Sequence, residues 1–140
     1  MEERKTFVAI HQPNYFPWLG YFAKIIAADV FVFLDDVQYS KNSYINRVKI
    51  QHGISSRWLS IPVKAHLGND IQDVIPAKVN WTKDHHEILK NNYQKASFRK
   101  EVLPIIKEIL DSIPDGNLSE INRFIVQKIS SLLDLKCKFV

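Results

Sequence analysis

The residues that could carry out chemistry follow two short apolar segments of the chain. His11 directly follows the apolar residues 6–10, and Asp35 and Asp36 directly follow the apolar residues 30–34. A carboxylate near an imidazole raises the pKa of the ring and fixes its tautomer. That pairing suits a general base that deprotonates an amine or hydroxyl nucleophile. We therefore predict His11, Asp35 and Asp36 as catalytic residues.

Each of these residues also has a structural interpretation. His11 can bond to a backbone carbonyl in a turn, and the acidic pair can be a solvated turn or a cap. Adjacent strand residues point to opposite faces, so one acid is expected to face the site and the other to support a loop. Asp35 and Asp36 could also hold a divalent cation through their oxygens. Two carboxylates alone are a poor cage, and we predict no metal site.

Other polar residues are predicted to bind the substrate. The forked guanidinium of Arg47 can grip a phosphate or a carboxylate, although an ordinary exposed strand arginine looks the same in sequence. His85 and His86 are adjacent and diverge by about 100° around a helix, so at most one of them serves the site. Tyr93 lies eight residues after His85, on roughly the same helical face. The predicted substrate-binding residues are Gln12, Tyr15, Gln38, Asn46, Arg47, His85 and Tyr93.

Two strands and a helix between them must position His11 and the acids. Residues 6–10 and 30–34 have the short, β-rich, apolar composition of buried strands. Pro17 suits the first turn of a helix, which we predict over residues 17–28 with an apolar stripe of Leu19, Phe22, Ile25 and Ile26. This strand–helix–strand order indicates a parallel pair, whose loops emerge at one sheet edge. Ligands bind at that edge in open α/β sheets, and a helix start there favours an anion.

The rest of the chain predicts a hairpin and then helices. Residues 44–64 contain two strand-like segments around a turn. Apolar residues at helical spacing predict one helix over residues 82–94, capped by Thr82, and another over 99–113. A last helix follows, capped by Asn117 or Ser119, with Leu132 and Leu133 inward. Residues 135–140 resemble the start of a strand. We predict a single α/β domain over residues 1–140: an open, mainly parallel sheet with flanking helices, a β-hairpin insertion and a helical C-terminal part.

Composition limits the classes of ligand and partner. The net charge of +4 mildly favours an anionic ligand but is too small and scattered to indicate nucleic acid. Cys137 is the single cysteine, which excludes a disulfide framework. The sequence contains no signal-peptide pattern and no apolar run approaching the roughly 18 residues of a membrane span. We expect a cytoplasmic protein without a membrane span.

Four long motifs give the chain a family resemblance. The stretches "IHQPNYFPWLGYFAKI", "FLDDVQYSKNSYINR", "WLSIPV" and "NWTKDHHEILKNNYQKASF" resemble the WbqC-like protein family over most of the 140 residues. The family's usual second half is missing here, so the resemblance implies either the N-terminal part of a longer family protein or a naturally short member. The family pattern includes His11, Gln12, Tyr15, Asp35, Asp36, Gln38, Asn46, Arg47 and Tyr93.

The resemblance also implies a pathway. It associates the chain with bacterial O-antigen and other surface polysaccharides, and with acyl or aminoacyl (glycine) transfer to an amino sugar. The expected partner is a small anionic substrate, either a nucleotide sugar or an activated acyl donor. A non-catalytic binding or scaffold protein of a glycan-assembly pathway remains an alternative. So does a nucleotidyltransferase-like nucleotide-binding enzyme, although Pro13 and Asn14 stand where such sites need glycine and a second histidine. The sequence specifies no cofactor and no oligomeric state.

Overall fold

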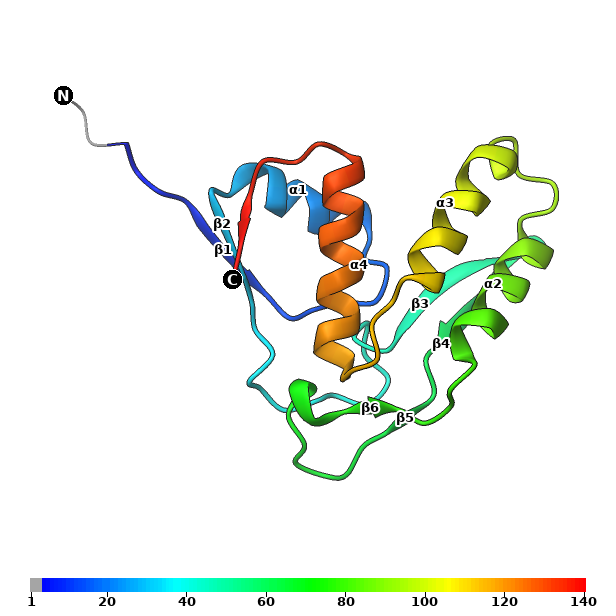
Figure 1. The fold of residues 1–140 in the computed structure, drawn as a ribbon, viewed down its shortest axis with the longest axis horizontal. Coiled ribbons are helices and arrows are strands. Elements are labelled where there is room, and N and C mark those ends of the chain that lie inside the picture. Colours follow the sequence, from blue (N-terminus) through cyan, green and yellow to red (C-terminus); the bar gives the residue numbers. More distant parts are fainter. Residues whose placement is uncertain (1–3) are drawn as a thin grey trace.

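A computed structural model describes residues 4–140, and a short parallel sheet lies at one end of it (Figure 1). The sheet contains β1 (Val8–His11), β2 (Val30–Phe33) and β7 (Lys138–Phe139) in the order β1-β2-β7. Both pairs are parallel, and His11 is in register with Phe33. The predicted parallel pair and the strand near the C-terminal end are therefore confirmed.

Helices cover only one face of this sheet. A buried cluster joins α1 (Leu19–Ala27), Phe31 and Phe33 of β2, and Val126 of α4 (Leu118–Leu132). Strand residues alternate between faces, so the opposite face carries Val8 and Ile10, which are 56% and 55% exposed. Parallel sheets usually have both faces covered, and in residues 4–140 this one has a single covered face.

Helix α1 buries a different face from the one that the sequence predicted. Tyr21, Phe22 and Ile25 are its buried residues, whereas Leu19 is 87% exposed and Ile26 is 67% exposed. The predicted stripe was wrong at Leu19 and Ile26. The reason is that Tyr21 takes a core position, because its hydroxyl donates to the Gln12 carbonyl at 2.9 Å and this contact sets the rotation of the helix.

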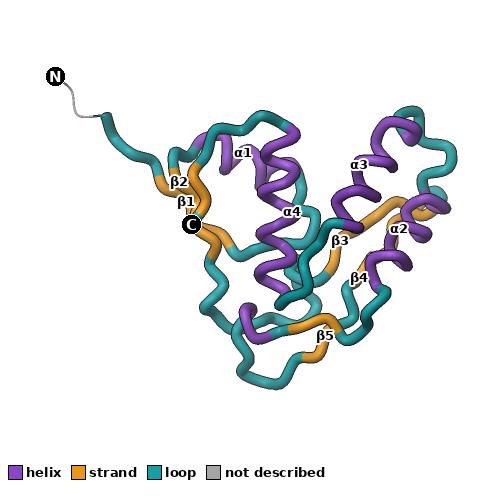
Figure 2. The backbone as a smooth tube through the Cα atoms, viewed as in Figure 1, coloured by secondary structure: helices purple, strands orange, loops and turns teal. Residues whose placement is uncertain are grey.

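The middle of the chain forms the expected hairpin. Strands β3 (Arg47–His52) and β4 (Ser55–Ser60) are antiparallel, and the turn between them has Gly53 at a φ of 61°, which favours glycine. A second small pair, β5 (Val63–Lys64) and β6 (Ile75–Pro76), encloses the 3₁₀ turn Ile71–Asp73. A long loop connects β2 of the parallel sheet to β3 (Figure 2).

Three helices make up most of the C-terminal part, as predicted. They are α2 (Trp81–Asn92), α3 (Arg99–Asp111) and α4. The predicted cap Thr82 was wrong, since α2 begins at Trp81 after Asn80 and has no side-chain cap bond. The predicted cap Asn117 is confirmed, because its side chain accepts from the Glu120 N–H at 2.9 Å. Leu132 and Leu133 were predicted inward, but they are 55% and 56% exposed where the helix ends.

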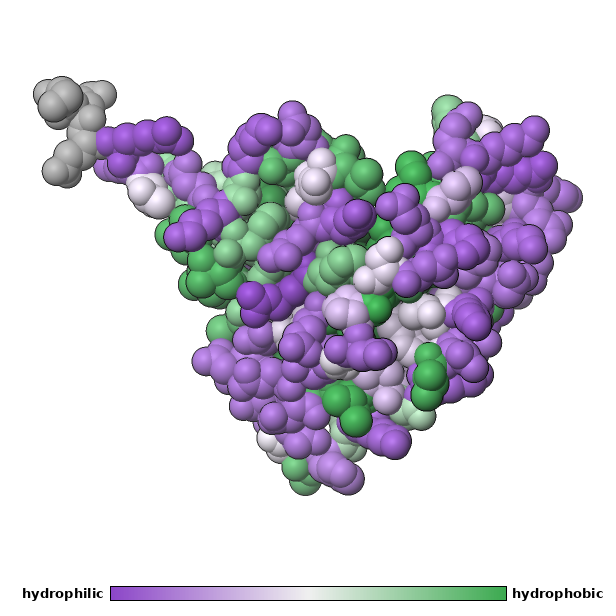
Figure 3. Space-filling view, viewed as in Figure 1, coloured by the Kyte–Doolittle hydropathy of each residue, from purple (hydrophilic) through white to green (hydrophobic). Residues whose placement is uncertain are grey.

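Helix α4 connects two hydrophobic cores. The larger core contains residues of the hairpin, α2, α3 and α4, including Leu59, Trp81, Ile109 and Ile125. The smaller core is the one between α1 and the sheet, and Ile129 of α4 packs against both. In Figure 1, α4 stands between the sheet with α1 and the part built from α2, α3 and the hairpin. Hydrophobic surface is visible in the notch between α4 and α3 (Figure 3).

Candidate functional site

His11 is held at the carboxyl end of β1 by its own loop. Its Nδ1 lies 2.9 Å from the carbonyl oxygen of Gln12, so in the neutral ring this nitrogen carries the proton and donates it. The same carbonyl accepts from the Tyr21 hydroxyl, and the two rings meet edge to face with centroids 4.7 Å apart. Burial raises the pKa of Tyr21, which keeps its hydroxyl protonated as a donor. The loop thereby fixes the orientation and tautomer of His11 and leaves Nε2 as the acceptor.

Asp35 follows β2 at the same edge and bonds to α4. Its carboxylate accepts from the Ser119 hydroxyl and lies 3.4 Å from the Arg123 guanidinium. The guanidinium also lies over the Phe33 ring, 5.3 Å from its centroid, and its side chain is 38% exposed. The edge therefore carries a partly exposed cation and a carboxylate that is already paired with it.

The two strand ends are close neighbours in the backbone. The Leu34 N–H donates to the His11 carbonyl at 2.9 Å, so Asp35 begins directly beyond the strand pairing. The structure brings His11 and Asp35 to one sheet edge, but each has its own partners. Within residues 4–140, no hydrogen bond or ion pair joins His11 to Asp35 or Asp36. Asp36 and Gln38 are exposed, and Gln38 forms a backbone bridge with Asp70.

His85 is buried and serves as an internal tie. It is 3% exposed; its Nδ1 lies 2.8 Å from the Tyr15 hydroxyl and its Nε2 3.0 Å from the Ser60 carbonyl. Burial lowers the pKa of His85 and raises that of Tyr15 well above its usual value. The ring is therefore neutral, with Nε2–H donating to Ser60 and Nδ1 accepting from Tyr15. Both nitrogens are used inside the fold, which joins α2 to the loop after β1.

The Arg47 guanidinium stacks on the Trp58 ring and is partly used in bonds within the protein. Its guanidinium carbon lies 3.8 Å from the centre of the Trp58 ring, and one terminal nitrogen donates to the Asn42 carbonyl at 2.5 Å. Its Nε is buried without a partner in the described residues. Asn46 donates to the Ile61 carbonyl at 3.2 Å and keeps its own oxygen buried and unpartnered in the same part of the chain. A phosphate could reach only the remaining donors of Arg47.

Tyr15 and Tyr93 line two adjoining cavities near the hairpin. Tyr15 lines a cavity of about 550 Å³, and Tyr93 lines an apolar cavity of about 510 Å³. Phe16 is in both linings and has a φ of 39°, a left-handed conformation that is uncommon for such a side chain. The Tyr93 hydroxyl also accepts from the Gln51 N–H at 3.0 Å. Neither cavity is lined by His11 or Asp35.

Sequence reasoning missed the residues of α4 at the sheet edge. Ser119 and Arg123 are four residues apart, so they lie on one face of the helix, and that spacing was the available signal. It does not say which strand end the face meets, because that depends on how α4 packs. Sequence reasoning also missed the role of Tyr21 in holding His11, because that contact depends on how α1 packs.

The described part of the chain contains neither a cluster of metal-ligating side chains nor a membrane-spanning helix. Across residues 4–140, no group of three or more His, Cys, Asp or Glu side chains is arranged to hold a metal ion. In the same residues, no helix combines the length and apolar character needed to cross a membrane.

Comparisons with known proteins identify a family. The sequence profile described as the WbqC-like protein family matches residues 12–140. A curated related protein from Mycobacterium tuberculosis (strain ATCC 25618 / H37Rv), named "Uncharacterized protein Rv1507c", is 33% identical to this chain over 133 residues. The match covers 94% of this chain and 58% of the relative, so the chain spans little more than half of that protein's length. No solved structure matches the chain. Because the family profile and the relative both extend over nearly all of it, this chain belongs to the WbqC-like protein family.

Proposed function

We propose that the protein takes part in acyl or aminoacyl transfer to an amino sugar during synthesis of a bacterial surface polysaccharide. Glycine is the proposed aminoacyl group. The pathway rests on the family resemblance, which associates such proteins with O-antigen synthesis. The reaction type rests on the sheet edge that carries His11, Asp35 and Arg123.

The observation that carries the proposal is the way His11 is held. One ring nitrogen is fixed by the Gln12 carbonyl, so the other is left as a proton acceptor of defined direction. The same contact fits the structural interpretation of His11 as a turn residue, and the general-base proposal adds the use of the free Nε2. Arg123 supports an anionic substrate at the same edge, since guanidinium groups bind phosphates and carboxylates through parallel donors.

The proposed step balances as a simple acyl transfer. The amine nitrogen of the sugar attacks the carbonyl carbon of an activated acyl donor, and His11 Nε2 takes the proton that the nitrogen loses. A carbon–nitrogen bond forms, and the bond to the thiolate or alkoxide leaving group breaks. The proton then passes from His11 to the leaving group. Among the described residues, Asp35, which is paired with Arg123, and Asp36 form no ion pair with His11, so their negative charge acts on the imidazolium only at longer range.

The test is a direct transfer assay with mass spectrometry. The chain is incubated with a glycyl thioester or glycyl ester and a nucleotide-linked amino sugar, and the sugar is examined for one added glycyl residue. We expect His11→Gln to remove the product. His66→Gln is the matched control, because His66 is exposed in a loop and lies outside the proposed site. Full turnover by a folded His11→Gln protein would exclude His11 as the base.

A non-catalytic binding or scaffold role is the second candidate, and exposed aromatic residues favour it. Trp18 is 65% exposed and Tyr44 is 51% exposed, and both line the cavity of about 550 Å³. A thermal-shift screen with nucleotide sugars, acyl donors and divalent ions separates a ligand site from a surface that binds none of them. A ligand at a hundredfold excess over its dissociation constant stabilises a protein by about 2.7 kcal/mol. No response to any of these compounds would favour the scaffold.

A further inference from the structure

An apolar cavity and a basic cavity meet between α2 and α3. The apolar one has a volume of about 510 Å³ and lies between the hairpin and these helices. The basic one has a volume of about 500 Å³ and lies along the facing sides of α2 and α3. Arg99 and Leu103 are in both linings, so the two cavities adjoin at these residues. Both volumes are in the range of small-molecule sites.

The apolar cavity suits a hydrocarbon chain. Phe16, Ile50, Leu89 and Ile106 contribute side chains to its wall, together with Phe98 and Val102. Phe98 is 71% exposed and Val102 is 48% exposed, so apolar surface remains open to solvent at this cavity. Covering such surface with a hydrocarbon would be favourable, because it removes apolar area from water.

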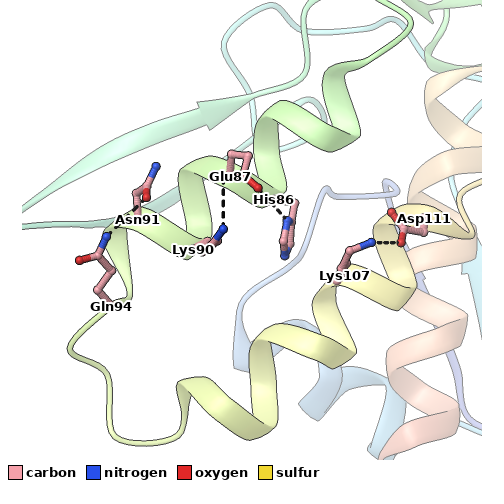
Figure 4. Close-up of polar contacts among 7 residues, drawn as sticks. All are labelled: His86, Glu87, Lys90, Asn91, Gln94, Lys107 and Asp111. Carbon is pink, nitrogen blue, oxygen red and sulfur yellow. Dashed lines mark hydrogen bonds and ion pairs between the residues drawn. The ribbon is translucent and has the colours of Figure 1, made fainter.

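The basic cavity suits an anionic group. Lys90, Arg99, Lys100 and Lys107 line it with His86, and no acidic residue is in the lining. Figure 4 shows His86 and Lys90 on the side of α2 that faces α3, with Lys107 on the facing helix. Glu87 lies 3.6 Å from both Lys90 and His86 without lining the cavity, and Asp111 pairs with Lys107.

Two cations at the junction have no such partner. Within residues 4–140, Arg99 and Lys100 form no ion pair. In this described part of the chain, Arg99 therefore lies unpaired where the two linings meet, and Lys100 lies unpaired beside it in the basic lining. An arginine at that point can bind two oxygens of one phosphate through its fork.

We propose that the adjoining cavities bind a lipid phosphate with a single alkyl or isoprenoid chain. The chain occupies the apolar cavity, and the phosphate lies against Arg99 and Lys100. This is a binding site separate from the sheet edge of His11 and Asp35, and it does not depend on the transfer chemistry proposed there. A free phosphate would leave the apolar wall uncovered, and a neutral lipid would leave the cations without a counter-charge.

Calorimetric titration of the 140-residue chain with decyl phosphate, below its micelle-forming concentration, tests the proposal. We expect decyl phosphate to bind at least about tenfold more tightly than inorganic phosphate or 1-decanol, because only the first compound satisfies both cavities. Arg99→Gln with Lys100→Gln should weaken decyl phosphate binding about tenfold or more, as expected for loss of charged hydrogen bonds. Ala96→Trp, which places bulk in the apolar lining, should weaken decyl phosphate and leave weak phosphate binding unchanged.

Lys83→Gln provides the control for charge alone. Lys83 is an exposed residue of α2 that lines neither cavity, and Lys83→Gln removes one positive charge, as Arg99→Gln alone does on α3. The proposal is overturned if Lys83→Gln weakens binding as much as the junction variants, or if decyl phosphate binds no better than its two parts. It is also overturned if the chain sediments with phosphatidylglycerol vesicles but does not bind decyl phosphate in solution, because that result indicates a membrane surface.

Discussion

At the scale of single residues, two histidines use their ring nitrogens differently. His11 uses one ring nitrogen inside its loop and leaves the other as an acceptor, whereas His85 uses both nitrogens inside the fold. A base needs a nitrogen that a substrate can reach, and a structural tie needs both of them satisfied. The difference lies in the partners and not in the residue type.

The buried state of His85 predicts a pH-dependent stability. Burial lowers its pKa, so below about pH 6.5 the unfolded chain binds a proton that the folded chain does not. The free energy of unfolding should therefore decrease as the pH falls below that value, until the pH passes the pKa of the folded state. His85→Gln should reduce this decrease and cost about 1 kcal/mol at neutral pH. Urea unfolding at pH 7 and pH 5 measures both effects.

His66→Gln is the control for this pH effect. His66 is exposed, so its substitution should leave the decrease in stability as it is in the unmodified chain. Identical pH dependence in His85→Gln and the unmodified chain would remove His85 as the source.

Substitution of Asn122 should cause a large loss of stability. It is fully buried, and its side-chain nitrogen donates to the carbonyls of Pro13 and Ile45 at 2.9 and 2.7 Å. Asn122→Leu would leave both carbonyls buried without this donor, at a cost of about 2–4 kcal/mol in the free energy of unfolding. Chemical denaturation measures the loss. Gln127→Leu, an exposed change on the same helix, should alter stability by less than about 0.5 kcal/mol.

At the scale of the element, α4 is the helix on which both cores and the sheet edge depend. Its buried face includes Ile121, Ile125 and Val126, and the turn before them supplies Ser119 to Asp35. The start of the helix is fixed by a reciprocal cap, in which Asn117 and Glu120 each accept from the other's backbone N–H. The cap therefore helps to set the position of the residues at the sheet edge.

The caps of α4 and α2 give a matched pair of substitutions. Asn117→Ala removes a side-chain bond to the Glu120 N–H and should lower the free energy of unfolding by about 1 kcal/mol. Asn80→Ala removes the same side chain at the start of α2, where no side-chain cap bond exists, and should cost much less. Thermal or urea unfolding of the two variants measures the difference. Equal losses would show that the cap bond of Asn117 contributes nothing.

At the scale of the whole molecule, the parallel sheet is covered on one side only. Ala9, Phe31 and Phe33 face the smaller core, while Val8 and Ile10 are more than half exposed. The larger core lies on the other side of α4 and makes no use of the sheet. Stability in this chain should therefore depend on one face of the sheet and be nearly insensitive to the other.

Substitutions on the two faces test this asymmetry. Phe31→Ala deletes a fully buried ring and should cost about 3–5 kcal/mol in the free energy of unfolding. Ile10→Thr changes an exposed residue of the neighbouring strand and should stay within about 0.5 kcal/mol. Urea unfolding followed by circular dichroism gives both values. A loss at Ile10 comparable to that at Phe31 would mean that the open face is covered in solution.

Much of the fold could be predicted because it depends on local patterns. The parallel strands, the hairpin with Gly53 and the Asn117 cap each follow from residues close together in the chain. Predictions failed where packing decides rotation or length. Tyr21 displaced Leu19 and Ile26 from the buried face of α1, and α2 begins before Thr82 without a side-chain cap. The sequence placed His11 near the acids, but its ring bonds to the neighbouring Gln12 carbonyl, whereas the partners of Asp35 and His85 come from distant segments.

The sequence by itself determined the family, the order of the elements and the placing of His11 and Asp35 at neighbouring strand ends. It could do so because strand and helix patterns and the motif "HQPNYFPW" are local properties. Only the tertiary structure decided which partners those side chains have and that α4 supplies Ser119 and Arg123. It also decided that one sheet face stays open and that an apolar cavity adjoins a basic one. Those outcomes depend on contacts between distant segments, such as that between Asp35 and Arg123, which are 88 residues apart, and no local pattern specifies which distant surfaces meet.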